Sequence, residues 1–279
     1  MRKIIGVTFL LIFVGVIVTI VGFLMSDSTD LNLFERPNYE LTELSYEADE
    51  IDSFKMIFLN RGLEVYPSVD DKIKIEYYEA ENDWIEVNLE GTKLDLLNRS
   101  RWYLFTTRNW WNIGEPNYWV VKVYLPEGLI NYSLDLTTSN GSIEIKDIEN
   151  INVIDLGTSN GAIRLTNVVS TGGIKADSSN GKVILTNIVS GGLIDLRTSN
   201  GDIIVDSITA MNLKVLTSNG SIDVDIIASY EDYRVELATS NGKTYIDGLQ
   251  RNDPIYNASK TNLIRLNTSN GTIRLNFIQ

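Results

Sequence analysis

The side chains in this sequence that are best suited to chemistry are carboxylates. The 279 residues include 37 Asp and Glu but no Cys and no His. Without these two residue types the chain has no disulfide, no thiolate or imidazole ligand for zinc, no Cys nucleophile and no His-based catalytic dyad or triad. The chemistry left to carboxylates is the binding of calcium and the cleavage of glycosidic bonds by a carboxylate pair.

The placement of the carboxylates favours neither of these two chemistries. Calcium-binding repeats carry a carboxylate within the turn, whereas the repeated turn of this chain, Ser-Asn-Gly, carries none. No Asp or Glu cluster stands apart from the general scatter of charge. We therefore expect no catalytic residue, no metal site and no cofactor. A glycan-active enzyme stays an alternative, because some β-helical enzymes act on polysaccharides with paired carboxylates.

A second kind of candidate site is an aromatic binding surface. The stretch RWYLFTTRNWWNIGEPNYW, from Arg101 to Trp119, mixes arginines and aromatic residues on an otherwise acidic chain. The candidate binding surface consists of Trp102, Tyr103, Trp110, Trp111, Tyr118 and Trp119. It could stack on sugars, dock a partner or dip into a membrane interface. Alternatively, these side chains are buried as a cap over the end of a repeat array.

A repeat in the second half of the chain predicts the strands that would position such a surface. Ser-Asn-Gly occurs seven times at a nearly constant spacing, and only the last step is much longer than the others. The pairs at these turns are Asn140 and Gly141, Asn160 and Gly161, Asn180 and Gly181, Asn200 and Gly201, Asn219 and Gly220, Asn241 and Gly242, and Asn270 and Gly271.

The residues around each turn alternate as in strands with one buried face. Positions seven and five before the glycine and two, four and seven after it give five columns over seven repeats. Of these 35 positions only Thr244 is polar. A unit of about 20 residues cannot bury its own apolar face, so copies must stack at about 4.8 Å per rung. The predicted fold is all-β: a β-solenoid of about seven rungs with an N-terminal β cap, preceded by one transmembrane helix.

We interpret the repeated turn as architectural. Gly accepts a positive φ and Asn tolerates the left-handed region, so together they could turn the chain sharply. Stacked in register, the Asn residues predict an amide ladder, and the Thr or Ser three residues before each Gly predicts a hydroxyl ladder. Six residues before the glycines stands a column of mixed charge, which predicts a solvated face with ion pairs between rungs. That column is Asp135, Asp155, Lys175, Asp195, Lys214, Glu236 and Arg265.

The N-terminus predicts a membrane anchor. Ile4 to Leu24 is an uncharged run of 21 residues, long enough at 1.5 Å per residue to cross a core of roughly 30 Å. The alternative is a cleaved signal, for which Ser26-x-Ser28 is a weak site; the lack of Cys excludes a lipoprotein anchor. Because Arg2 and Lys3 precede the run and acidic residues follow it, we expect a single-pass protein of the cell membrane with its C-terminal domain extracellular.

Four segments follow from these patterns. Residues 1–24 are the cytoplasmic tip and transmembrane anchor, 25–43 an acidic tether, 44–133 an N-terminal β region with the aromatic loop, and 134–279 the β-solenoid repeats. The last and longest repeat step holds the stretch Leu249 to Asn262, which we interpret as an insertion looped out of one rung. The net charge of −13 repels phosphate backbones, so no nucleic acid is expected as a partner.

The motifs also resemble a known family. The strand VKVYLP from Val121 to Pro126, followed by repeats such as LTTSNGSIEI from Leu136, resembles the bacterial putative-adhesin family, a β-strand-repeat domain of unknown function. Its members include accessory membrane proteins of envelope-stress operons such as the Lia system. The resemblance covers about Leu44 to Gln279 and implies the fold, and the family supplies no catalytic residues.

The sequence thus predicts a membrane-anchored extracellular β-solenoid that acts as a non-enzymatic, adhesin-like binding or structural module of the bacterial cell envelope. Expected partners are the membrane itself, through the single N-terminal span, and cell-wall polymer, a glycan, another cell's surface or a membrane protein. One alternative is an accessory protein of an envelope-stress signalling or transport system that acts through a membrane partner. The other alternative is the glycan-active enzyme.

Overall fold

The computed structural model describes residues 38–100 and 118–278. Within them the chain forms strands and a single short 3-10 turn, Tyr230–Asp232, which confirms the predicted all-β class. The predicted anchor, residues 4–24, lies outside the described residues. Among the residues described, no helix is long and apolar enough to cross a membrane.

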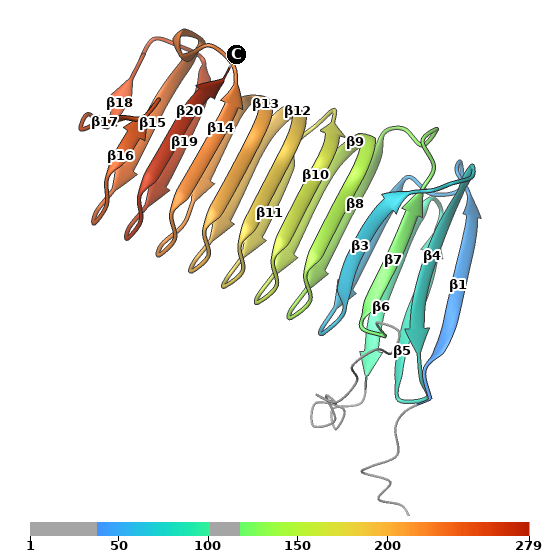
Figure 1. The fold of residues 1–279 in the computed structure, drawn as a ribbon. Coiled ribbons are helices and arrows are strands. Elements are labelled where there is room, and N and C mark those ends of the chain that lie inside the picture. Colours follow the sequence, from blue (N-terminus) through green and yellow to red (C-terminus); the bar gives the residue numbers. More distant parts are fainter. Residues whose placement is uncertain (1–37, 101–117, 279) are drawn as a thin grey trace, which may run out of the picture. The chain divides into compact units, whose positions relative to one another are not determined.

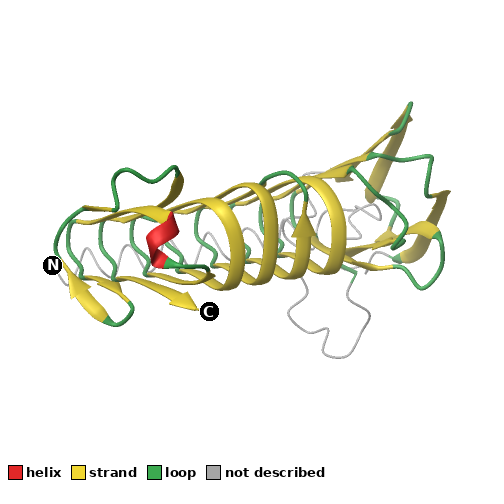
Figure 2. Ribbon diagram, turned by 90° about the horizontal axis from the view of Figure 1, so that it is seen from above, coloured by secondary structure: helices red, strands yellow, loops and turns green. Residues whose placement is uncertain are grey.

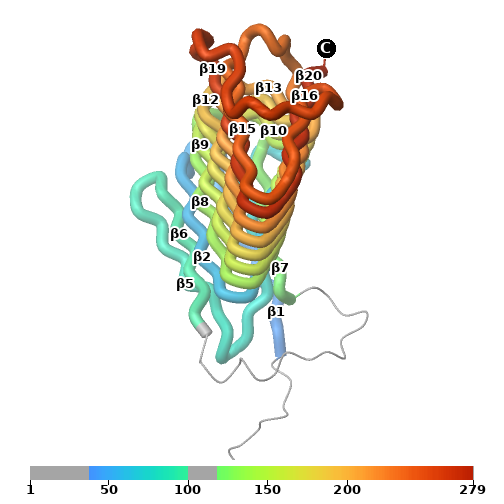
Figure 3. Tube along the Cα trace, turned by 90° about the vertical axis from the view of Figure 1, so that its left-hand side faces the viewer, coloured from blue at the N-terminus to red at the C-terminus, as the bar shows by residue number. Residues whose placement is uncertain are grey.

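The described residues form twenty strands, of which all but β2 are labelled in Figure 1 and β2 is labelled in Figure 3. They are β1 (Glu40–Glu47), β2 (Ser53–Phe58), β3 (Gly62–Pro67), β4 (Lys72–Glu79), β5 (Asp83–Glu90), β6 (Lys93–Ser100), β7 (Val120–Leu125), β8 (Tyr132–Thr138), β9 (Ile143–Thr158), β10 (Ile163–Ser170), β11 (Ile174–Ser178), β12 (Val183–Thr198), β13 (Ile203–Leu216), β14 (Ile222–Ile227), β15 (Tyr233–Thr239), β16 (Thr244–Ile246), β17 (Leu249–Arg251), β18 (Ile255–Tyr256), β19 (Asn262–Thr268) and β20 (Ile273–Ile278).

The strands of each rung belong to two parallel ladders, which run side by side. The first has the spatial order β6, β2, β8, the end of β9, β11, the ends of β12 and β13, β19 and β15. The second has the order β7, β3, the start of β9, β10, the starts of β12 and β13, β14, β20 and β16. Each rung gives one strand to each ladder, and Figures 2 and 3 show the rungs following one another along a common axis.

The inward columns predicted from the repeats form the core of the stack. In the second ladder Ile163 pairs with Ile143 on one side and with Val183 on the other, and all three side chains are fully buried. Ile203 and Ile222 continue the same column with no exposed surface. Burying a side chain of this size contributes about 1.5–3 kcal/mol, so the columns supply the main stabilisation of the stack.

The order of rungs in space departs from their order in the sequence at both ends. The C-terminal rung, β19 with β20, lies between the rung of β13 and β14 and the rung of β15 and β16. Figure 1 shows the red strands β19 and β20 in that position. In the same way the rung of β2 and β3 lies between the rung of β6 and β7 and the first Ser-Asn-Gly rung. The parallel rungs therefore end in β6 and β7 at one end, where β5 and β4 pair antiparallel with them, and in β15 and β16 at the other.

The stack extends further toward the N-terminus than the repeated motif. We expected the rungs to begin at residue 134, but the ladders also include residues 53–57, 62–67, 93–97 and 120–125. Seven Ser-Asn-Gly rungs and these two make nine in the described part of the chain. β1 begins at Glu40, inside the segment expected to be a tether, and pairs with β4. The predicted insertion supplies β17 and β18, which pair antiparallel with the last rung.

The corner asparagines form a continuous amide ladder along the stack. In each rung the Asn Nδ2 donates to the Asn Oδ1 of the neighbouring rung over 2.7–2.8 Å. The ladder begins at Asn60, in a corner without the repeated motif, and ends at Asn241. Its order is Asn60, Asn140, Asn160, Asn180, Asn200, Asn219, Asn270 and Asn241.

A hydroxyl ladder runs beside the amides and explains the Thr or Ser at each corner. Thr158 Oγ1 donates to the Gly141 carbonyl oxygen of the neighbouring rung over 3.0 Å and accepts from the Gly161 N–H of its own rung, also over 3.0 Å. The same pair of bonds recurs at Ser178 and Thr198. Only a hydroxyl both donates and accepts at this position, which is why Ser replaces Thr but no apolar residue does.

The reason for the corner glycine differs from the one that the sequence suggested. Neither Asn nor Gly of the repeated turn has a positive φ, so the prediction that they adopt the left-handed region was wrong. Instead, a Cβ on any of the seven glycines would lie 1.6–2.0 Å from the carbonyl oxygen of the adjacent rung's corner residue. Glycine is required because the backbones of stacked corners touch.

Four residues with a left-handed backbone conformation lie at a second corner, six residues after the Ser-Asn-Gly glycine of their own rung. Their φ angles lie between 54° and 58°, and the strand bends at each of them; they are Asp147, Asn167, Asn187 and Ser207. Asn187 Nδ2 donates to Asn167 Oδ1 over 2.8 Å, which adds a second, shorter amide ladder. Asn and Asp adopt this conformation more readily than other non-glycine residues, since their side chains hydrogen-bond locally.

Candidate binding surface

A buried ion pair lies beside the end of the stack that β6 and β7 form. Arg61 occupies the corner position that Gly holds in the seven repeats, and its side chain is 1% exposed. Its Nη2 lies 2.8 Å from Asp83 Oδ2, and its Nη1 donates to the carbonyl oxygens of Tyr78 and Tyr118 over 2.6 and 3.2 Å. The guanidinium therefore binds the Asp83 carboxylate and satisfies two backbone carbonyl oxygens.

Asp83 collects two further donors from other segments. Tyr39 donates its hydroxyl to Oδ2 over 3.2 Å, and Asn98 Nδ2 donates to Oδ1 over 2.9 Å. Burial and the negative charge of Asp83 raise the pKa of Tyr39 above its ordinary value, so the phenol stays protonated and donates. The carboxylate thus ties the residue before β1, the corner before β3 and strand β6 together.

Four aromatic rings pack over this ion pair, and we call Tyr39, Tyr78, Tyr118 and Trp119 the aromatic cluster. Tyr39 stacks on Tyr118 with 5.1 Å between ring centroids, and Tyr78 meets Tyr118 edge-on at 5.0 Å. Trp119 contacts Tyr39 edge-on at 5.8 Å and keeps 36% of its surface exposed. Ring geometries of this kind contribute about 0.5–1.5 kcal/mol per pair beyond burial.

The aromatic cluster contains two of the six residues predicted as a binding surface, Tyr118 and Trp119. The other four, Trp102, Tyr103, Trp110 and Trp111, lie outside the described residues. Sequence reasoning missed the other members of the cluster and the ion pair beneath it. One signal was present: in Asn60-Arg61-Gly62 a corner asparagine is followed by Arg instead of Gly.

The pairing of the flanking strands locates the segment that carries the remaining aromatic residues. β6 pairs with β2 and β7 pairs with β3, so β6 and β7 form one rung. Residues 101–117 join these two strands at the place where a short turn joins the strands of a repeat rung. The strands on both sides of this segment therefore belong to the stack, whereas residues 101–117 themselves lie outside the described residues.

The charged face predicted from the repeats is present. Lys175 pairs with Asp155 of the neighbouring rung at 2.9 Å, and Arg265 pairs with Glu236 at 2.6 Å. Lys214 lies 3.5 Å from Asp195. These side chains are partly exposed, so each pair contributes no more than about 1 kcal/mol.

Acidic residues gather around one shallow hollow. Glu127, Asp147 and Glu149 line a space of about 320 Å³ beside Tyr132. Over residues 38–100 and 118–278, no group of three Asp or Glu side chains is arranged to hold a metal ion. These three carboxylates could serve the glycan-active alternative. Asp147, however, already accepts a hydrogen bond, since Asn167 Nδ2 donates to its Oδ1.

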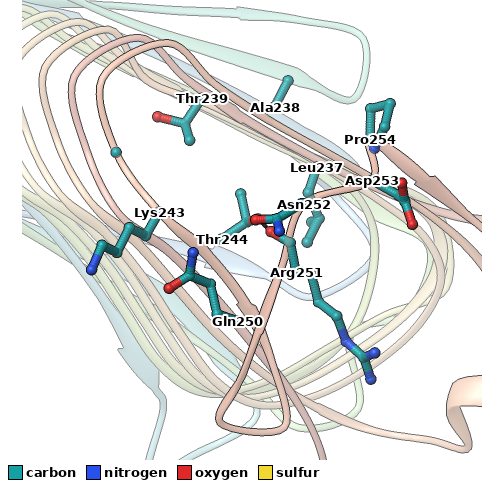
Figure 4. A pocket seen from close by; sticks show the side chains of 11 residues that line it. Leu237, Ala238, Thr239, Lys243, Thr244, Gln250, Arg251, Asn252, Asp253 and Pro254 are labelled. Atoms are coloured by element: carbon teal, nitrogen blue, oxygen red, sulfur yellow. Dashed lines mark hydrogen bonds between the residues drawn. The ribbon is translucent and has the colours of Figure 1, made fainter.

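A second hollow lies at the opposite end of the stack, against the last rung. It measures about 330 Å³ and is shown in Figure 4. Its lining is Leu237, Ala238, Thr239, Gly242, Lys243, Thr244, Gln250, Arg251, Asn252, Asp253 and Pro254. Thr244, the one polar residue in the predicted inward columns, is among them.

The chain was compared with known proteins. The model of the Toastrack DUF4097 family matches residues 57–225 and, in an overlapping match, 132–276. No curated protein matches the chain. Similar solved structures include a putative adhesin from Bacteroides fragilis NCTC 9343, with 16% identity over 86% of this chain and 98% of that one and a TM-score of 0.48.

Two further similar structures come from Parabacteroides distasonis ATCC 8503. One is a putative adhesin, with 12% identity over 85% of this chain and 97% of that one and a TM-score of 0.39. The other is a putative lipid binding protein, with 15% identity over 87% of this chain and 97% of that one and a TM-score of 0.36.

Proposed function

Because the chain belongs to the Toastrack DUF4097 family, we propose that it is a non-enzymatic, adhesin-like binding module of the bacterial cell envelope. Its β-solenoid serves as a rigid support that displays the aromatic segment from Arg101 to Trp119. The ligand of that segment is a cell-wall polymer or a lipid surface.

One observation carries this proposal: β6 and β7 form one rung of the stack, and the stretch of sequence between them is the aromatic segment. Every repeat rung joins its two strands through Thr or Ser, Ser, Asn and Gly, whereas the whole stretch 101–117 stands between β6 and the residues before β7. Loops mounted on a rigid scaffold are where binding residues concentrate.

The buried ion pair gives the segment a rigid base. Arg61, paired with Asp83, donates to the carbonyl oxygen of Tyr118, and Tyr118 stacks on Tyr39 in the aromatic cluster. Trp119 remains partly exposed beside the segment. Tryptophan, tyrosine and arginine are the residue types that contribute most to binding interfaces, and this segment combines all three.

We also propose that the module stands outside the cell. The charge pattern of Arg2, Lys3 and the apolar run Ile4 to Leu24 supports a single span with the C-terminal domain extracellular. The acidic domain, with 22 basic and 37 acidic residues after the span and hence a charge of −15, would keep clear of anionic lipid except through a local feature. The aromatic segment, with Arg101 and Arg108, is such a feature.

Co-sedimentation tests the proposal. Residues 38–279 form one compact unit, and we expect this unit to sediment with purified cell wall or with anionic liposomes. The double variant Trp110→Ala, Trp111→Ala should bind at least about tenfold more weakly, because buried aromatic anchors dominate such interfaces. The matched control is Met211→Ala, which shortens an apolar side chain that is 62% exposed on β13, several rungs away from β6 and β7.

Two results would count against this account. Equal binding by the double variant and the control would show that the aromatic segment is not the binding surface. Failure of the unmodified unit to sediment with wall, anionic liposomes or neutral liposomes would overturn direct recognition of wall and lipid. That second result would favour the accessory role, in which the chain acts through a membrane-protein partner.

A further inference from the structure

The hollow at the β15 and β16 end of the stack has the features of a second binding site, which goes beyond the function proposed above. It lies between the last corner, Thr239 to Thr244, and the segment Gln250 to Pro254 (Figure 4). Its volume of about 330 Å³ is at the lower end of the range, roughly 300–1,000 Å³, that small-molecule sites occupy. A ligand of the size of one sugar residue fits this range better than a peptide or a polymer segment.

The hollow occupies the place where the corner of a further rung would stack. In the stack each corner carbonyl oxygen accepts a hydrogen bond from a Thr or Ser hydroxyl of the following rung. The last of these bonds is from Thr239 to the Gly271 oxygen, over 3.0 Å. Within the described residues no hydroxyl donates to the carbonyl oxygen of Gly242.

The geometry of the ladder directs this carbonyl toward the hollow. Corner carbonyls all accept from the rung on the same side, so the Gly242 oxygen faces beyond the last rung, where the hollow lies. Gly242 is exposed, whereas Gly141, Gly161 and Gly181 are buried under their neighbours. A ligand that supplies a hydroxyl could donate a hydrogen bond to the Gly242 carbonyl oxygen.

The side chains around the hollow can bond further hydroxyls. Gln250 and Asn252 are exposed, and each carries an amide donor and an acceptor that make no side-chain hydrogen bond within the described chain. Thr244 replaces the apolar residue of its column, and its hydroxyl donates to the Arg251 carbonyl oxygen, which fixes the segment against the rung. Ala238 and Pro254 provide an apolar wall, against which the C–H face of a sugar ring could pack.

The charges around the hollow do not favour an ionic ligand. Figure 4 shows the side chains of Lys243 and Arg251 extending away from each other, so they form no common cradle for an anion. Asp253 is the one carboxylate in the lining and could not hold a metal ion alone. Apart from these three charged side chains, the polar groups that line the space are neutral amides, hydroxyls and a backbone carbonyl, the set that recognises hydroxyl groups.

We propose that this hollow binds a single neutral sugar residue, either free or at the end of a glycan. One sugar hydroxyl donates to the Gly242 carbonyl oxygen in place of the hydroxyl of a further rung. The amides of Gln250 and Asn252 bind other hydroxyls, and the ring packs on Pro254 and Ala238. The proposed site thus lies at the end of the stack opposite to β6 and β7, the strands that flank the aromatic segment in the sequence.

Titration of the full chain with galactose, mannose and N-acetylglucosamine tests this site. The protein is kept in solution in a detergent without a sugar headgroup. We expect at least one of the three sugars to bind with millimolar affinity and to shift the backbone amide signals of Lys243 and Asn252 in a ¹H–¹⁵N spectrum. The double variant Gln250→Ala, Asn252→Ala should weaken that binding by about tenfold, with an unchanged thermal midpoint because both side chains are exposed.

A matched variant separates this site from the aromatic segment. Trp110→Ala, Trp111→Ala should leave sugar binding and the shifts at Lys243 unchanged, even though it weakens binding to wall or lipid. The proposal of a sugar site is overturned if none of the three sugars shifts these signals, or if the Gln250→Ala, Asn252→Ala variant binds as tightly as the unmodified chain. Loss of sugar binding in the tryptophan variant would place the sugar on the aromatic segment instead and would equally overturn this site.

Discussion

Replacement of Gly161 by Ala is expected to lower the free energy of unfolding by roughly 3 kcal/mol or more. The new Cβ would lie 1.7 Å from the Gly141 carbonyl oxygen and 2.4 Å from its carbonyl carbon. Both are backbone atoms, so no side chain can move aside. The rungs would have to separate, although Asn160 N–H donates to the Ser139 carbonyl oxygen over 2.9 Å and Ile143 N–H to the Ala162 oxygen over 2.9 Å. Urea unfolding followed by circular dichroism measures this loss.

Gly128→Ala is the matched control for this substitution. A Cβ at Gly128 would have no heavy atom within 4 Å, and its φ lies outside the left-handed region. We expect the control to change the free energy of unfolding by less than about 0.5 kcal/mol. Equal effects of the two substitutions would show that the corners do not touch as described.

Replacement of Asp83 by Ala is expected to cost about 3–5 kcal/mol, because it leaves the Arg61 guanidinium buried without a counter-charge. The exposed fractions of the two side chains are 1% and 4%, so water does not screen the pair. Tyr39 and Asn98 would lose their acceptor at the same time. Equilibrium unfolding in urea, followed by circular dichroism, gives the size of the loss.

Two controls distinguish the buried charge from other effects of this substitution. The double variant Arg61→Met, Asp83→Leu removes both charges and should recover most of the lost stability, since apolar side chains often replace a buried ion pair without loss. Arg99→Met breaks the pair of Arg99 with Glu86, whose side chains are 50% and 51% exposed, and should cost less than about 1 kcal/mol. If Asp83→Ala costs no more than Arg99→Met, the ion pair does not support the cluster.

The rung pattern could be derived from the sequence because it depends on local alternation. Ile163 and Leu165 face inward for the same reason as Ile143 and Ile145, and the regular spacing of the repeats places them in one column. The resemblance that rests on the same repeats was confirmed by the match to the Toastrack DUF4097 family. The charged face also follows, because residues that alternate with a buried column must meet water.

The order of the rungs could not be derived, because the apolar columns of β15 and β16 match those of β19 and β20. Leu237 and Leu266 stand at the same position of their repeats, and either could follow Val215. The structure places Leu266 beside Val215, and Leu237 beyond it. Similarly, the corner at Asn60 escaped detection, since Phe58 and Arg61 replace the Thr and Gly of the motif.

The candidate sites were only partly predictable for a related reason. Tyr118 and Trp119 belong to an aromatic stretch that composition alone reveals, whereas Tyr39 reaches them from the start of the described chain, just before β1. The hollow at the other end depends on which rung is last, and therefore on the exchanged order. Thr244 was the single exception in 35 column positions, and the structure places it in this hollow.

The exchanged order of rungs determines what lies at each end of the stack, and cysteine pairs test it most directly. The chain has no native Cys, so pairs can be introduced at the corner asparagines without interference. Neighbouring rungs place equivalent Cα atoms about 4.8 Å apart, within the range of a disulfide, and rungs two apart exceed about 7 Å. We predict that Asn219→Cys with Asn270→Cys forms an intramolecular disulfide under mild oxidation and that Asn219→Cys with Asn241→Cys does not. The reverse result, identified by peptide mass mapping, would mean that the rungs stack in sequence order and would contradict this account.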